Sequence, residues 1–108
     1  MSKSLEELIK LNDWLEVSQY KYLTEGFIQE NQDKVNWDLI SRDQKLTLDF
    51  IREFQDKVDW EYISQDQNLT LDFVKENINR LNYDSLIKNK YLDQNAVKQI
   101  YEMYGDLV

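Results

Sequence analysis

Residues 34–56 read KVNWDLISRDQKLTLDFIREFQD, and residues 57–79, which follow directly, read KVDWEYISQDQNLTLDFVKENIN. The two segments agree at 13 of 23 positions, so the chain contains an internal repeat with a period of 23 residues. The same shift in either direction finds two more divergent copies, which are LNDWLEVSQYKYLTEGFIQENQD at 11–33 and RLNYDSLIKNKYLDQNAVKQIYE at 80–102. Four copies of one short unit therefore organise the chain.

Each copy carries the signals of two short helices. A residue suited to capping a helix start stands directly before an aromatic residue, and an aliphatic residue follows three positions after the aromatic. The capping residues are Asp13, Asn36, Asp59 and Asn82, the aromatic residues are Trp14, Trp37, Trp60 and Tyr83, and the aliphatic residues are Val17, Ile40, Ile63 and Leu86. A second capping row opens a longer helix and is preceded by a leucine that packs against its first turn. Its members are Thr24, Thr47, Thr70 and Asp93, preceded by Leu23, Leu46, Leu69 and Leu92.

The two ends of the repeated region also have helix signals. Ser4 and Glu7 form a capping-box pattern, so residues 4–10 are predicted to be a helix that covers the first copy as the second helix of a preceding copy would. The last helix is predicted to run to about Tyr104 and to stop at Gly105, a residue suited to a left-handed turn. We expect a single domain over 1–108: an N-terminal capping helix in 1–10, repeats at 11–33, 34–56, 57–79 and 80–102, and a C-terminal end at 103–108.

A 23-residue hairpin cannot bury its apolar face alone, whereas stacked copies bury a continuous core. The sequence therefore predicts an all-α fold, a short α-solenoid of four stacked 23-residue helix pairs plus the N-terminal helix. The residues that recur in register and are apolar in the two best copies should form its core, namely Trp14, Trp37, Trp60, Ile40, Ile63, Leu46, Leu69, Phe50 and Phe73.

Composition excludes many functions. The chain has no Cys and no His, which removes thiol chemistry, disulfides, histidine-dependent catalysis and zinc sites of the usual kind. Acidic loops lack the order of ligands that binds calcium, and no carboxylate pair is marked as sheltered, so we expect no metal, no cofactor and no enzymatic activity. The net charge of −8 argues against direct nucleic-acid binding. The absence of a long apolar run argues against a membrane segment and predicts a soluble, cytoplasmic protein.

The central copies carry the motif W-x-x-I-S-x(4)-L-[ST]-x-x-F-[IV], followed by D-K-V-[DN]-W. It runs from Trp37 through Ser41, Leu46 and Phe50 to Trp60 and is repeated from Trp60 to Val74. This motif resembles short tandem helical repeats in proteins of large DNA viruses, bacteriophages and some bacteria. The first and fourth copies depart from it, with Gly26 and Asn31 in the first and Tyr83, Ile87 and Ala96 in the fourth. The resemblance implies a viral or bacterial origin and a binding role, and it carries no catalytic residue.

Residues 23 apart should line up along the stack, which places several carboxylates in rows. One row is Glu30, Glu53 and Glu76, with Glu7 before it, and another is Asp43 and Asp66. Such rows are ordinary solvated surface if neighbours such as Arg52 and Lys75 offset them, and they are a binding surface if they meet a basic partner. A further row brings Leu39 and Tyr62 to one surface, where an aromatic beside a leucine is an alternative anchor for a partner.

Two functions remain open from the sequence. The first is a non-catalytic protein-binding repeat module that covers a basic surface of a partner, in particular a phage or viral inhibitor of a host defence or regulatory protein that acts in the host cell cytoplasm. If the partner handles nucleic acid, the carboxylate rows would mimic phosphates. The alternative is a structural or self-assembling repeat protein. The sequence leaves the oligomeric state open.

Overall fold

The computed structural model describes residues 3–105, and this part of the chain contains nine helices and no strand. The all-α prediction is therefore confirmed. The helices are α1 (Leu5–Lys10), α2 (Trp14–Ser18), α3 (Glu25–Glu30), α4 (Trp37–Asp43), α5 (Leu48–Glu53), α6 (Trp60–Asp66), α7 (Leu71–Glu76), α8 (Tyr83–Leu86) and α9 (Gln94–Gly105). Residues 1–2 and 106–108, which the sequence placed in the same single domain, lie outside the described residues.

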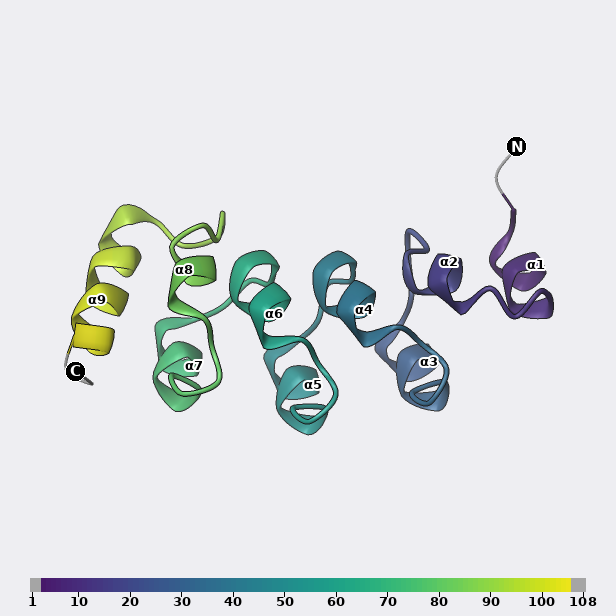
Figure 1. The fold of residues 1–108 in the computed structure, drawn as a ribbon, viewed down its shortest axis with the longest axis horizontal. Coiled ribbons are helices and arrows are strands. Elements are labelled where there is room, and N and C mark those ends of the chain that lie inside the picture. The colour runs from purple at the N-terminus through teal and green to yellow at the C-terminus, as the bar shows by residue number, and fades with distance from the viewer. Residues whose placement is uncertain (1–2, 106–108) are drawn as a thin grey trace.

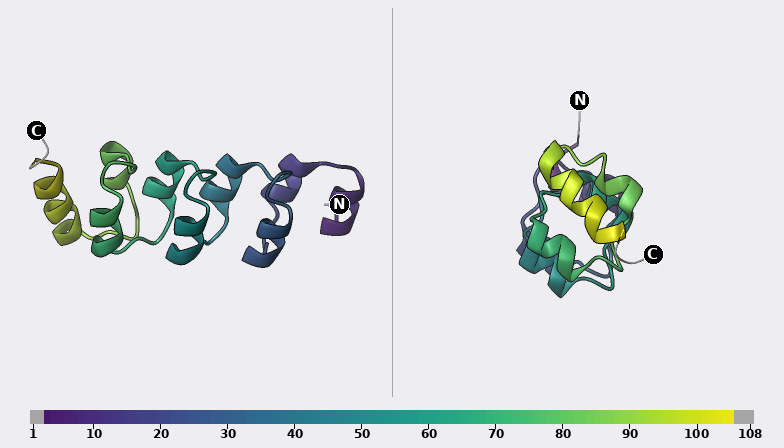
Figure 2. Two further views of the ribbon diagram at one scale, coloured as in Figure 1. Left: turned by 90° about the horizontal axis from the view of Figure 1, so that it is seen from below. Right: turned by 90° about the vertical axis from the view of Figure 1, so that its left-hand side faces the viewer.

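The helices form two rows along an elongated molecule that measures 50 × 27 × 18 Å (Figure 1). The first helices of the copies, α2, α4, α6 and α8, contact one another in sequence along one row. The second helices α3, α5 and α7 form the other row, and α9 closes the C-terminal end against α7 (Figures 1 and 2). Equivalent positions of successive copies therefore lie next to one another along the long axis.

Both predicted rows of helix caps are present. The side chains of Asp13, Asn36, Asp59 and Asn82 accept hydrogen bonds from backbone N–H groups in the first turns of α2, α4, α6 and α8. Thr24, Thr47 and Thr70 accept from the N–H groups of Phe27, Phe50 and Phe73, and Asp93 accepts from that of Ala96. Because these helices are short, satisfying even one free N–H at each start is a sizeable part of their local stability.

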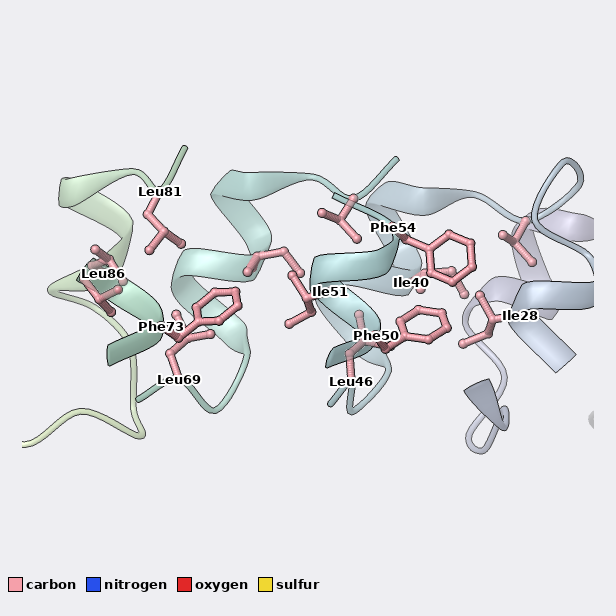
Figure 3. Close-up of a cluster of buried hydrophobic side chains, with 14 of the residues drawn as sticks. Ile28, Ile40, Leu46, Phe50, Ile51, Phe54, Leu69, Phe73, Leu81 and Leu86 are labelled. Atoms are coloured by element: carbon pink, nitrogen blue, oxygen red, sulfur yellow. The ribbon is translucent and has the colours of Figure 1, made fainter. Parts of the chain in front are cut away.

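The core is a continuous column between the two rows (Figure 3). Six of the predicted core residues are buried, namely Ile40, Ile63, Leu46, Leu69, Phe50 and Phe73. The three tryptophans Trp14, Trp37 and Trp60 are only half-buried and pack against the edge of the column. An indole N–H needs an acceptor, and those of Trp37 and Trp60 donate to the carbonyls of Gln32 and Gln55 at 2.9 Å in the turns before their helices.

Buried polar side chains join each copy to the next. The hydroxyl of Ser18 accepts a hydrogen bond from the N–H of Asn36, that of Ser41 from Asp59, and that of Ser64 from Asn82. Each serine in the row lies 18 residues before the N-cap that it bonds, so every junction between copies is held in the same way. The sequence motif includes Ser41 and Ser64, and the structure supplies their role.

Side-chain amides form a second set of junctions. Gln67 donates from Nε2 to the carbonyls of Ser41 and Gln44, at 2.8 and 2.7 Å, and accepts from the N–H of Leu46 at 3.0 Å. One copy earlier, Gln44 donates to the carbonyls of Ser18 and Tyr20 and accepts from the N–H of Leu23. Its second carbonyl partner is displaced by one residue relative to that of Gln67. A buried amide that satisfies three backbone groups fixes both the position and the angle of the neighbouring copy.

The terminal helices agree with the sequence in extent. Ser4 caps α1 through the N–H of Glu7, as the capping-box pattern predicts, and α1 contacts α2. At the other end the helix includes Gly105 and no glycine in the described residues has a positive φ, so the left-handed turn predicted there is wrong. The left-handed conformation occurs instead at Asn12, with φ 56°, in the tight turn between α1 and α2.

Candidate binding surfaces

The predicted row of glutamates lies along the ends of the second helices. Glu30, Glu53 and Glu76 are the last residues of α3, α5 and α7, and all three are exposed. Within residues 3–105, Glu30 and Glu53 form no ion pair, whereas Glu76 does. The three side chains therefore share a surface but do not share an electrostatic environment.

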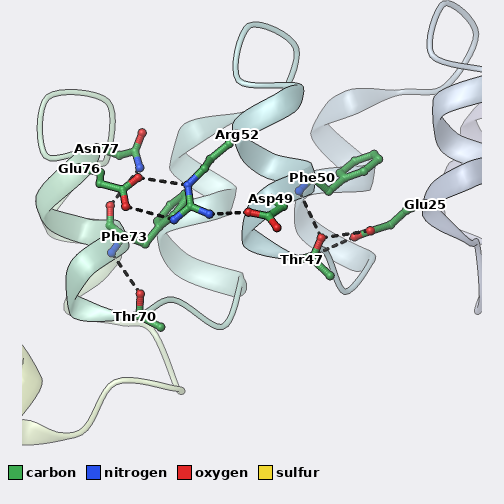
Figure 4. A network of polar contacts seen from close by, with 9 residues as sticks. All are labelled: Glu25, Thr47, Asp49, Phe50, Arg52, Thr70, Phe73, Glu76 and Asn77. Carbon is green, nitrogen blue, oxygen red and sulfur yellow. Dashed lines mark hydrogen bonds and ion pairs between the residues drawn. The ribbon is translucent and has the colours of Figure 1, made fainter.

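Arg52 is the residue that breaks the uniformity of this row (Figure 4). Its guanidinium donates to both carboxylate oxygens of Glu76 in the next copy, at 3.1 and 3.2 Å, and to Asp49 at 2.8 Å on its own helix. The bond to Glu76 is the first cause of the raised pKa of Arg52, which keeps the guanidinium charged. The surface near α5 and α7 is consequently less negative than its number of carboxylates suggests.

Asp43 and Asp66 end the neighbouring helices α4 and α6 and lie close enough to affect one another. Arg42 holds Asp43 through two bonds of 2.8 Å. The pKa of Asp66 is raised, first by burial and then by the charge of Asp43, while Arg42 and Lys90 act in the opposite direction. The two aspartates thus lie near one another, as their spacing in the sequence predicts. However, Asp43 is already paired with Arg42, and Asp66 is half-buried.

Leu39 and Tyr62, the alternative anchor, occupy equivalent positions on α4 and α6. Both are half-buried, so neither projects freely into solvent. Tyr62 lies near Arg42 and adds to the effect of Asp43 in raising the pKa of that guanidinium. A partner could therefore contact only the exposed parts of these two side chains, and neither of them protrudes as an anchor.

A different surface is hollowed. The segments 19–24, 42–47, 65–70 and 88–93 each contain the connection between the two helices of a copy, and we call them together the loop edge. A hollow of about 430 Å³ is lined there by Arg42, Asp43, Lys45, Asp66, Lys90 and Tyr91, among others. A second hollow of about 270 Å³ is lined by Lys21, Tyr22, Leu23, Asp43, Gln44 and Lys45. Because the two share Asp43, Gln44 and Lys45, they adjoin along the loop edge.

The residues that the structure describes contain neither a metal-binding cluster of acidic side chains nor a helix able to span a membrane. Within 3–105 no three acidic side chains come close enough together to hold a metal ion. No helix in the same range has the length and apolar character needed to cross a bilayer.

Sequence reasoning missed the residues that connect the copies through their side chains. Gln44 and Gln67 stand directly after the aspartates Asp43 and Asp66, and the repeated D-Q pair was a usable signal, because a glutamine kept at the same position in both best copies has a structural reason. Glu25 is the other omission. Its carboxylate accepts hydrogen bonds from the N–H and the hydroxyl of Thr47 in the next copy, at 2.7 and 3.1 Å (Figure 4). The central copies have leucine at the equivalent positions, so the repeat pattern does not predict this contact.

Comparison of the chain with protein-family models, with curated proteins and with solved structures finds no match.

Proposed function

We propose that this protein is a non-catalytic protein-binding repeat module whose acidic second-helix surface covers a basic surface of a partner protein. The observation that carries the proposal is the exposed, unpaired state of Glu30 and Glu53 on neighbouring second helices, within the described residues. Exposed carboxylates on a rigid stack attract a basic partner over a distance and orient it on approach.

The resemblance of the repeats to those of phages and large DNA viruses supports a more specific version. In this version the protein is an inhibitor, acts in the cytoplasm of a host cell, and occludes a host defence or regulatory protein. Where that partner binds nucleic acid, the carboxylates stand in for phosphates and compete with DNA or RNA.

The test is a double charge reversal, Glu30→Lys with Glu53→Lys. Glu76 is left unchanged in the first variant because its reversal also breaks the bonds to Arg52 and adds a cation beside it. The matched control reverses Glu6 and Glu102, which are exposed on the terminal helices α1 and α9 and give the same change in net charge. Circular dichroism checks that both variants remain helical.

The partner is first isolated on the immobilised protein from a bacterial lysate and identified by mass spectrometry. Its Kd is then measured for the parent and both variants over a range of salt concentrations. We expect the reversal of Glu30 and Glu53 to slow association and weaken binding, and the control to change it little. Equal affinity of the two variants would show that the acidic surface is not the interface. A single self-oligomer in light scattering, with no retained partner, would favour self-assembly instead.

A further inference from the structure

The loop edge has the opposite charge character to the rest of the molecule. Its four segments carry five cations and three carboxylates in a chain whose net charge is −8. The cations are Lys21, Arg42, Lys45, Lys88 and Lys90, and all five side chains belong to exposed residues. This surface therefore attracts a different class of partner from the one that the glutamate row attracts.

Most carboxylates at the loop edge are already engaged. Asp43 is held by Arg42, and Asp93 accepts the N–H of Ala96 at the start of α9. In contrast, Lys21, Lys45 and Lys90 form no ion pair with any described residue, and the ammonium of Lys90 lies 5.2 Å from the centre of the Tyr91 ring. Three lysines are thus available to an incoming anion, and each lines at least one of the two adjoining hollows.

Exposed tyrosines mark both ends of these hollows. Tyr22 is 82% exposed and Tyr91 41% exposed, and each follows a lysine in a K-Y-L tripeptide, at 21–23 and at 90–92. The central copies place the buried amides of Gln44 and Gln67 where the outer copies have these lysines. A large exposed ring beside a cation offers apolar contact area together with charge, a combination common at binding surfaces.

We propose that the loop edge binds an extended acidic peptide segment, whose carboxylates pair with Lys21, Lys45 and Lys90 and whose ends pack on Tyr22 and Tyr91. The surface is pre-formed, because Gln44 and Gln67 beneath it are fixed by hydrogen bonds to neighbouring copies. Binding there costs little ordering of the protein. This surface is separate from the glutamate row, so the inference goes beyond the proposed function.

A peptide fits this surface better than a nucleic acid does. Every nucleotide of a nucleic acid carries a phosphate charge, whereas a peptide can place acidic residues at the lysines and uncharged residues elsewhere. The chain, with its net charge of −8, repels the uniformly charged polymer more strongly. In addition, Asp43 and Asp66 in the hollow repel phosphates but accept N–H groups of a peptide backbone. Helix neighbours lie about 8 to 10 Å apart, so the three steps between four copies span about seven to nine extended residues.

The test uses a fluorescein-labelled peptide of alternating Glu and Ser, about ten residues long, titrated with the full chain at low salt and followed by fluorescence anisotropy. We expect saturable binding that weakens as salt is added. Reversing the three lysines, K21E with K45E and K90E, should raise the Kd at least about tenfold. The matched control, K10E with K75E and K98E, makes the same change in net charge at exposed positions off the loop edge and should change the Kd by less than about threefold.

A second pair of variants tests the tyrosines. Removal of both rings in Y22A with Y91A should weaken binding, whereas Y101A, which removes a ring that is 66% exposed on α9, should not. The proposal is overturned if the peptide shows no saturable binding or if both lysine triples weaken it equally. Tighter binding of an oligothymidylate of about eight nucleotides would overturn it in favour of a single-stranded nucleic acid. Because Glu30 and Glu53 lie off the loop edge, each of these failures leaves the proposed function untouched.

Discussion

The central copies and the fourth copy make the same junction with different side chains. Between the second and third copies, Gln67 donates to two carbonyls and accepts the buried N–H of Leu46. Between the third and fourth, Asn89 donates to the equivalent carbonyls of Ser64 and Gln67 at 2.8 Å, but its oxygen accepts the N–H of Tyr91 in its own copy. A shorter amide, displaced by one residue in the repeat, keeps two of the three hydrogen bonds to the preceding copy.

The serine row shows a similar difference. Ser18, Ser41 and Ser64 each bond the N-cap of the following first helix, and the position that follows in the register is Ile87, which is 42% exposed. Within residues 3–105, no further first helix follows Ile87, so there is no first-helix N-cap for this position to bond. The copies thus have the same residue where the N–H of a neighbouring copy needs an acceptor, and a different residue where no such N–H is present.

The largest expected effect is on core packing in the central copies. Phe73 is fully buried, so Phe73→Ala should lower the free energy of unfolding by about 3 to 5 kcal/mol. Phe27 is the half-buried equivalent in the first copy, and Phe27→Ala should lower the free energy of unfolding clearly less. Urea denaturation of the two variants measures the difference. If Phe73→Ala does not fold, Phe73→Leu can be measured in its place. Its free energy of unfolding should fall by about 1 to 2 kcal/mol. Equal losses at both sites would show that the copies are packed alike.

The next effect concerns the amide junctions. Gln67→Met keeps the length of the side chain but leaves a buried N–H and two carbonyls without their partner, which should cost about 2 to 3 kcal/mol. Asn89→Leu should cost less, because water can replace the bond to Tyr91 at the exposed loop edge. Gln65→Met, at an exposed position on α6 two residues before Gln67, is the control and should lie within about 0.5 kcal/mol of the parent. A loss at Gln67 no larger than at Gln65 would contradict the junction's role.

A smaller effect is expected for the serine row. Ser64→Ala removes the acceptor of the Asn82 N–H, a bond of 2.9 Å, and should cost about 1 kcal/mol. The reciprocal variant, Ile87→Ser, places a hydroxyl where no first helix of a following copy is present in the described residues, and its free energy of unfolding should stay within about 0.5 kcal/mol of the parent. Amide hydrogen exchange gives a local readout, since the Asn82 N–H should exchange faster in Ser64→Ala only. Unchanged exchange at Asn82 would count against this bond.

The smallest effect distinguishes Asp43 from Asp66, two of the three aspartates of the loop edge. The pKa of Asp66 is raised from 3.8 by burial and by Asp43, so the folded protein favours the protonated carboxyl. Its ionised form therefore costs stability once the pH lies above the raised pKa, and that cost vanishes below 3.8, where Asp66 is protonated in both the folded and the unfolded state. We expect Asp66→Asn to raise the melting temperature slightly near neutral pH and to lose this advantage in acid. Asp43→Asn, which breaks the pair with Arg42, should show no such gain.

The local structure was largely predictable from the sequence. Capping residues, an aromatic residue and an aliphatic residue recur every 23 positions, and these signals act over three or four residues, so they predicted the helix starts that the structure has. The acidic rows were also predictable as positions, because equal spacing in a stacked repeat brings equivalent residues together. The half-buried state of the tryptophans was not, since it depends on how closely the turn before each helix approaches the indole.

What the sequence by itself determined is the repeat, the all-helical class and the exposed glutamates Glu30, Glu53 and Glu76. Only the tertiary structure decided which of these charges are free, because Arg52 reaches Glu76 across a copy boundary and lies 24 residues away from it in the chain. The loop edge depends on the same kind of contact. Its lysines are dispersed in the sequence and become one basic surface only when the copies stack, because side-by-side packing converts a separation of 23 residues into neighbouring positions.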